Sequence, residues 1–150
     1  MNVTIMSRKN AVRYCGQKNP EPSVMISISD PRMAYDDKPY TSVENKIIDI
    51  LRLSFSDADG KGLDVYGNPV DESDLMTDED AARVAALVEA HQDVFVLVHC
   101  DAGISRSAGV AAAILKYYTG DDSQVFRSGR HYPNMWCYRK TLNALHALQI

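Results

Sequence analysis

The sequence predicts a single α/β domain over residues 1–150, with a central, mainly parallel sheet flanked by helices. Strand and helix patterns alternate along 150 residues, a length typical of one domain. Residues 95–98 are apolar without a polar interruption, as in a strand buried on both faces. Residues 107–115 are apolar nearly all round, which is typical of a buried helix. Such alternation within one domain favours parallel strands joined by helices.

The first third of the chain predicts three strands and one helix. Ser7 is a residue type that caps helices, and Pro31 stops the strand before it. The predicted elements, in chain order, are a strand at 3–5, a helix from Ser7 to about residue 14, a strand at 24–29, a loop at 32–40 and a partly alternating strand at 46–55.

The remainder predicts four further helices and one more strand. Residues 56–74 concentrate Gly, Pro, Asn and Asp in a loop long enough to be a candidate functional loop. Thr77 is followed by acidic residues and by apolar residues at helical spacing, which predicts a capped helix. The other predicted elements are a strand from Val94, the buried helix at 107–115, a short helix at 121–127 and a last helix at 134–148 with Met135, Tyr138, Leu142 and Leu145 on one face.

The composition excludes several classes of function. A formal net charge of −4 and an isoelectric point near 5.5 argue against a nucleic-acid partner. No apolar stretch approaches the roughly 18 residues of a membrane span, and the first residues lack a secretory pattern. We therefore expect a soluble, cytoplasmic protein without a membrane partner. Its 3 cysteines form no CxxC pair, so we expect no disulfide framework, metal or cofactor.

The loop that follows the buried strand predicts an anion site. Cys100 ends the strand, and ligands collect at the carboxyl ends of parallel strands. Backbone N–H groups of the loop and of the next helix would face one point, and Gly103 lets the loop curl around it. Arg106 adds a planar fork that grips two oxygens of a phosphate-like group. This positive surrounding favours the thiolate, the nucleophilic form of Cys100.

The segment "HCDAGISRS" resembles the HCxxGxSRS signature of the dual-specificity branch of cysteine-dependent protein-tyrosine phosphatases. All fixed positions are met, by His99, Cys100, Gly103, Ser105, Arg106 and Ser107. "YPNMWCYRKTLNAL" is similar to the Pro-Asn segment that opens the last helix in that family, and "LRLSFSD" is similar to the strand that precedes its general acid. The resemblance covers residues 46–150 and implies a phosphatase-like α/β fold.

The resemblance also implies a role for each residue of the segment. Cys100 would be the nucleophile that becomes a phosphocysteine, Arg106 would bind the phosphoryl oxygens, and Ser107 would stabilise the sulfur as a leaving group. His99 would order the loop rather than transfer protons. The phosphate-binding loop would comprise Asp101, Ala102, Gly103, Ile104, Ser105 and Arg106.

Three residues outside the loop keep two interpretations each. The general acid is Asp57, directly after a predicted strand, with Asp59 as the alternative. Asn134 either hydrogen-bonds near the phosphate loop or caps the last helix. Cys137 is interpreted as a small buried residue, with pairing to Cys100 under oxidation as the alternative.

The variable loop positions favour a phosphorylated protein or peptide as substrate. Asp101 and Ile104 offer no cation to a polyanionic inositol phosphate. Phosphotyrosine is therefore the predicted substrate, with phosphoserine and phosphothreonine as further candidates. Two other functions use a similar cysteine loop: a rhodanese-like sulfurtransferase or arsenate-reducing enzyme, and a catalytically inactive phosphopeptide-binding module.

Overall fold

Four parallel strands form the sheet of the computed structural model, which describes residues 1–60 and 62–149. Their spatial order is β1-β4-β2-β3, so β4, the strand that ends at Cys100, is flanked on both sides. The predicted α/β fold with a parallel sheet is confirmed. The strands are β1 (Val3–Ser7), β2 (Ser23–Ser29), β3 (Ile47–Ser54) and β4 (Phe95–Cys100).

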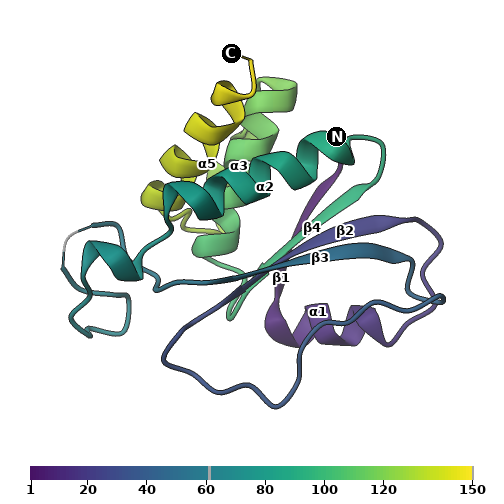
Figure 1. The fold of residues 1–150 in the computed structure, drawn as a ribbon, viewed down its shortest axis with the longest axis horizontal. Helices are drawn as coiled ribbons and strands as arrows, with labels where there is room; N and C mark the ends of the chain where they lie inside the picture. The colour runs from purple at the N-terminus through teal and green to yellow at the C-terminus, as the bar shows by residue number, and fades with distance from the viewer. Residues whose placement is uncertain (61, 150) are drawn as a thin grey trace.

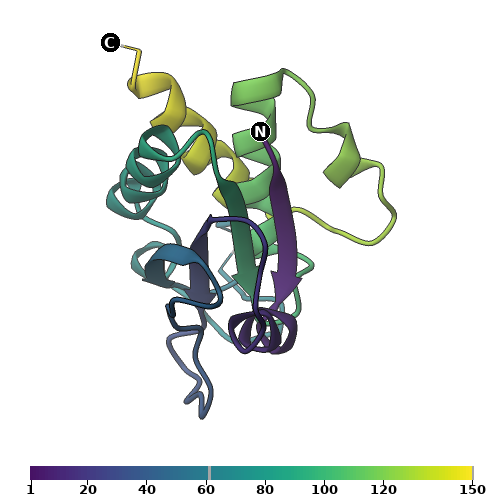
Figure 2. The same ribbon diagram turned by 90° about the vertical axis from the view of Figure 1, so that its right-hand side faces the viewer.

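The helices cover both faces of this sheet. Helix α1 (Arg8–Cys15) packs on one face, and α2 (Asp78–Ala90), α3 (Arg106–Thr119) and α5 (Met135–Ala147) pack on the other (Figure 1; Figure 2). Two short turns of helix complete the structure, η1 (Glu72–Asp74) and α4 (Ser123–Phe126). Every helix in the described part of the chain is too short or too polar to span a bilayer.

The two central strands are buried on both faces, as their apolar sequences predict. In β4, Val96 and Val98 belong to the main core under α2, α3 and α5, whereas Leu97 packs under α1. Side chains alternate along β2 in the same way, since Ile26 joins the main core and Met25 the smaller one. The sheet therefore holds β4 rigidly at its centre.

Helix α3 is buried from Arg106 to Leu115, which confirms the predicted buried helix and starts it one residue earlier. Its close approach to the segment before α5 requires a glycine. A Cβ at Gly109 would overlap the carbonyl oxygen of Asn134 and lie 3.1 Å from the Cβ of Cys137. A glycine on α3 thus brings Asn134 close to the strand-to-helix loop.

Several predicted helix ends agree with the structure. Ser7 accepts a hydrogen bond from the backbone N–H of Asn10, and Thr77 forms a capping box with Asp80. The predicted face of the last helix is wrong in part. Its buried side chains are Cys137, Thr141 and Leu145, whereas Met135 is exposed and Tyr138 and Leu142 are half-buried. The buried stripe includes a threonine because its hydroxyl reaches the sulfur of Met76, at 3.8 Å.

Candidate active site

The thiol of Cys100 lies at the carboxyl end of β4, directly beneath the loop 101–105. It is buried, and its Sγ lies 3.1 Å from the hydroxyl oxygen of Ser107 in the first turn of α3. A hydroxyl at this distance can donate a hydrogen bond to the sulfur when the sulfur carries negative charge. The fold therefore pairs the predicted nucleophile with the residue predicted to stabilise it.

Hydrogen bonds from neighbouring elements hold the carbonyl groups of the loop 101–105. The carbonyl oxygen of Asp101 accepts from the backbone N–H of Arg8, at 3.1 Å. Those of Ile104 and Ser105 accept from the backbone N–H groups of Tyr132 and Asn134, both at 2.9 Å. Carbonyl groups bonded to α1 and to residues 132–134 point outward, which directs the loop's N–H groups toward the space above Cys100.

The loop needs a glycine at its centre. Gly103 has a φ of +72°, in the left-handed region that favours glycine. A Cβ there would also lie 2.8 Å from backbone atoms of both Met6 and Ser7 at the end of β1. The carbonyl oxygen of Gly103 lies 3.1 Å from Nδ1 of the His131 ring. The left-handed turn and the close packing against β1 both explain why residue 103 is a glycine.

Arg106 is only 1% exposed, and its guanidinium is held from two sides. Nη1 donates to the carbonyl oxygen of Phe55 at 2.9 Å, and Nη2 lies 3.5 Å from the carboxylate of Asp101. Its Nε has no hydrogen-bond partner among the described residues although it is buried. An unpaired buried donor on a cation is costly unless an anion binds it, so this edge of the guanidinium is suited to a phosphoryl oxygen.

The charges around Arg106 keep it protonated. Burial acts to lower the pKa of its guanidinium, but the acidic groups of Cys100, Asp57 and Asp101 outweigh burial and leave this pKa above its usual value. A permanent positive charge therefore lies beside the thiol.

Asp57 lies at the edge of this cradle, just beyond the end of β3, and is 5% exposed. One carboxylate oxygen, Oδ1, accepts hydrogen bonds from the hydroxyl of Ser105 and from Nδ2 of Asn134, both at 2.8 Å. Asp59 is exposed, and it lines the same pocket of about 280 Å³ as Asp57. Of the two candidate acids, Asp57 is the one that contacts the phosphate loop through Ser105.

Asn134 combines both roles that the sequence left open. Its Oδ1 accepts from the backbone N–H of Cys137 and so caps α5. Its Nδ2 donates to Asp57 and to the carbonyl oxygen of Ala58, and its backbone N–H bonds the loop at Ser105. One side chain thus orients the candidate acid and begins the last helix.

His99 is wholly buried behind the loop, in its neutral form. Its Nδ1 lies 3.0 Å from the carbonyl oxygen of Cys100, which can only accept, so Nδ1 carries the proton. Its Nε2 then accepts from the hydroxyl of Ser27, at 2.6 Å, on the neighbouring strand. Burial is the main cause that lowers the pKa of His99, to about 4. This environment suits the ordering role and not proton transfer at neutral pH.

The burial of His99 makes the stability of the protein depend on pH. The unfolded chain protonates His99 near pH 6.5, whereas the folded protein does so only near pH 4, so stability present above pH 6.5 is lost as the pH falls toward 4. We expect His99 to lower the free energy of unfolding by about 3 kcal/mol between pH 7 and pH 4. Urea unfolding of wild type and His99→Gln at both pH values measures this. Equal pH dependence in the two proteins would contradict the expectation.

Cys137 is 1% exposed, in agreement with its interpretation as a small buried residue, and all three cysteines are free thiols in the structure. Burial raises the pKa of the Cys137 thiol well above its ordinary value, with the carboxylate of Asp57 as a second cause. Burial likewise raises the pKa of Cys15, under α1. Both thiols are therefore protonated at neutral pH.

Further residues, which the sequence did not predict, support the loop from a distance. Arg8 in α1 forms an ion pair with Asp101, with 3.3 Å between Nε and Oδ1, and stacks on the ring of Tyr35. The hydroxyl of Tyr35 donates to the other oxygen of Asp101, at 2.9 Å. His131 and Tyr132 bond the loop from the segment before α5. No local sequence pattern identifies these residues, because each of them contacts the loop from a segment that is distant in the sequence.

No family model matches the chain, and neither does any curated protein. Solved structures match it over nearly its whole length. The human tyrosine phosphatase-like serine/threonine/tyrosine-interacting protein has a TM-score of 0.63 at 19% identity, with 99% of this chain and 93% of that chain covered. PTPMT1 in complex with PI(5)P has a TM-score of 0.55 at 18% identity, with 99% and 92% covered.

A mouse putative dual specificity phosphatase complexed with zinc tungstate also matches, with a TM-score of 0.54 at 18% identity and coverage of 95% of this chain and 77% of that chain. Identities this low establish similarity of fold. The chain therefore has the fold of dual-specificity and tyrosine phosphatases, as the loop signature implied.

Proposed function

We propose that this protein is a cysteine-dependent phosphatase that hydrolyses phosphotyrosine in proteins or peptides, with phosphoserine and phosphothreonine as further substrates. One observation carries the proposal. Three groups border the loop 101–105: the thiol of Cys100, the carboxylate of Asp57 and the buried Nε of Arg106, which has no hydrogen-bond partner among the described residues. The loop's carbonyl groups are bonded to α1 and to residues 132–134, an arrangement that leaves its N–H groups for an anion. This arrangement provides a nucleophile, an anion clamp and an acid at one position.

In the first step of the proposed reaction, the Cys100 sulfur attacks phosphorus and the bond from phosphorus to the tyrosine oxygen breaks. Arg106 and the loop N–H groups hold the three equatorial oxygens. Asp57 donates its proton to the departing oxygen. Because Ser105 and Asn134 both donate to Oδ1, we assign that proton to the other oxygen of Asp57, Oδ2.

In the second step, the Asp57 carboxylate takes a proton from water while the water oxygen attacks the phosphocysteine. The sulfur–phosphorus bond breaks, and inorganic phosphate leaves. Ser107 donates a hydrogen bond to the departing thiolate from its position 3.1 Å away. Every group that the two steps require comes from the chain itself, so the proposed reaction uses no metal or cofactor.

The charges beside the loop support a protein substrate over an inositol phosphate. PTPMT1, a structural neighbour, was solved with PI(5)P. In this chain the first variable loop position is Asp101, whose carboxylate lies 3.5 Å from the guanidinium of Arg106. An acidic side chain there repels additional phosphate groups on the substrate.

A panel of peptides of one sequence, carrying phosphotyrosine, phosphothreonine or phosphoserine, tests the proposal. We expect hydrolysis of all three, fastest with phosphotyrosine because its phenolate is the best leaving group. Phosphate release measured with each peptide gives kcat/KM. Binding without release would indicate the phosphopeptide-binding module. Thiocyanate formation from thiosulfate and cyanide, without release of phosphate, would indicate the sulfurtransferase.

A further inference from the structure

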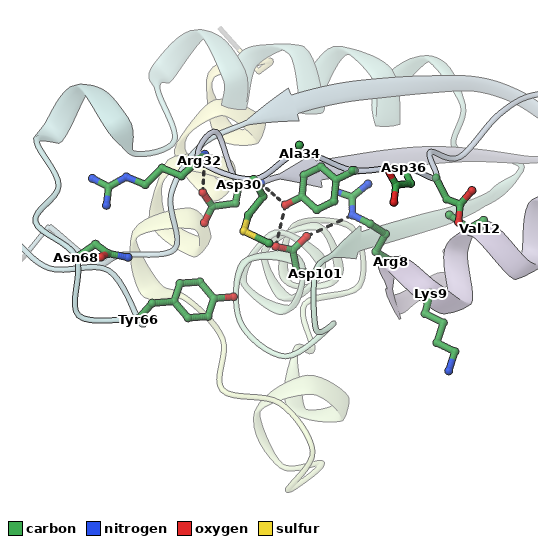
Figure 3. A pocket seen from close by; sticks show the side chains of 13 residues that line it. Arg8, Lys9, Val12, Asp30, Arg32, Ala34, Asp36, Tyr66, Asn68 and Asp101 are labelled. Carbon is green, nitrogen blue, oxygen red and sulfur yellow. Dashed lines mark hydrogen bonds and ion pairs between the residues drawn. The ribbon is translucent and has the colours of Figure 1, made fainter.

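A second, larger cavity of about 740 Å³ lies beside the phosphate loop (Figure 3). Its walls come from α1, from residues 30–37 after β2 and from Tyr66 and Asn68 in the long loop after β3. Asp101, the residue after Cys100, connects this cavity to the phosphate site. The cavity is therefore close enough to the phosphate site for one substrate molecule to occupy both.

The cations around this cavity are already engaged or turned away. Arg8 is paired with Asp101 and also donates to the hydroxyl of Ser29, at 2.8 Å. Arg32 donates to the carbonyl oxygen of Pro69 and lies 4.0 Å from the buried carboxylate of Asp64. Lys9 extends from α1 away from Asp101 (Figure 3). Arg8 and Arg32 are thus already engaged by other groups of the chain.

Besides Asp101, which is paired with Arg8, the cavity is lined by three further carboxylates, those of Asp30, Asp36 and Asp37. Asp30 is 3% exposed, and its Oδ1 accepts a hydrogen bond from a neutral backbone N–H, that of Arg32. Asp36 and Asp37 are exposed at the rim. Burial is the main cause that raises the pKa of Tyr66; the charge of Arg106 acts to lower this pKa, and Asp101, Asp57 and Asp30 act to raise it. The exposed carboxylates of Asp36 and Asp37 thus present negative charge to a group that enters the cavity.

The remaining walls are apolar and aromatic. Met33, Ala34 and Tyr66 supply surface suited to a hydrocarbon stem, and Tyr66 is 61% exposed at the mouth. The chain itself shows how a cation binds here, because the guanidinium of Arg8 stacks on the ring of Tyr35 at 3.6 Å, beside Asp101. An apolar wall with acidic groups at its end suits a long basic side chain.

We propose that this cavity binds a lysine or arginine side chain that lies near the phosphorylated residue of the substrate. The stem would pack on Met33 and Tyr66, and the positive head group would meet Asp36, Asp37 and Asp30. This inference rests on the proposed phosphatase function and specifies its substrate class, phosphopeptides with a neighbouring basic residue. An anionic membrane surface is disfavoured by the same carboxylates.

Phosphotyrosine peptides test the proposal. In otherwise alanine-rich peptides, one lysine, arginine or glutamate is placed at each of three positions on either side of the phosphotyrosine. We expect a basic residue at one or two positions to lower KM about fivefold relative to alanine, and glutamate there to raise it. Equal KM values for lysine, alanine and glutamate at all positions, or a preference for glutamate, would overturn the proposal.

One double variant and one single-site control make the test specific. Asp36→Asn combined with Asp37→Asn should remove the preference for the basic residue, whereas Asp93→Asn, an exposed carboxylate at the opposite end of β4, should leave it intact. Hydrolysis of para-nitrophenyl phosphate, which has no such side chain, should be unchanged in both. A preference that persists in the Asp36/Asp37 variant overturns the assignment of the cavity. Failure of wild type to hydrolyse para-nitrophenyl phosphate would instead refute the phosphatase function itself.

Discussion

Replacement of Cys100 by serine lowers hydrolysis of every phosphomonoester by about 10⁴-fold or more. A hydroxyl is a far weaker nucleophile than a thiolate at neutral pH. Release of para-nitrophenol from para-nitrophenyl phosphate measures the loss. Binding of a phosphotyrosine peptide to Cys100→Ser should persist, because Arg106 and the loop N–H groups remain.

The matched control is Cys15→Ser, since Cys15 is also a buried free thiol but packs under α1 in the smaller core. Its activity should stay near that of wild type. After rapid quenching, mass spectrometry of wild type should find phosphate on Cys100 and on neither other cysteine. Full activity in Cys100→Ser would refute the mechanism, and so would phosphate found on a residue outside the loop.

Replacement of Asp57 by asparagine lowers kcat for a phosphotyrosine peptide by about 10²- to 10³-fold. Asparagine keeps the size of the side chain and an oxygen for the hydrogen bonds from Ser105 and Asn134. Its amide has no acidic proton to transfer to the leaving group. With para-nitrophenyl phosphate the loss should be much smaller, because that leaving group departs without protonation. The ratio of the two losses separates general acid catalysis from a structural defect.

Asp59→Asn is the control for the choice between the two carboxylates. Asp59 is exposed, whereas Asp57 is buried against Ser105 and Asn134, so we expect Asp59→Asn to keep most of the activity. Kinetics of both variants on the same peptide decide the question. A large loss in Asp59→Asn with near-normal kcat in Asp57→Asn would assign the acid to Asp59 instead.

Local patterns predicted most elements of the fold because they report on neighbours in the chain. The caps Ser7 and Thr77 use residues three positions away, and the burial of β4 and α3 follows from their own apolar sequences. The prediction failed for one face of α5, where Thr141 is buried and Met135 is exposed. A threonine is buried there only because Met76, from a distant segment, lies within reach.

The sequence by itself determined the succession of strands and helices along the chain. It also identified the thiol, the arginine and the loop between them, since these three features lie within a few residues of each other. Only the tertiary structure decided what surrounds them. The carbonyl of Phe55 under Arg106, the contact of Asp57 with Ser105 and the pairing of Arg8 with Asp101 each join residues dozens of positions apart. Such contacts depend on the strand order β1-β4-β2-β3 and on the packing of α1 and α5. Periodicity in a chain shows which side of an element is buried, but it carries no information about which distant element covers it.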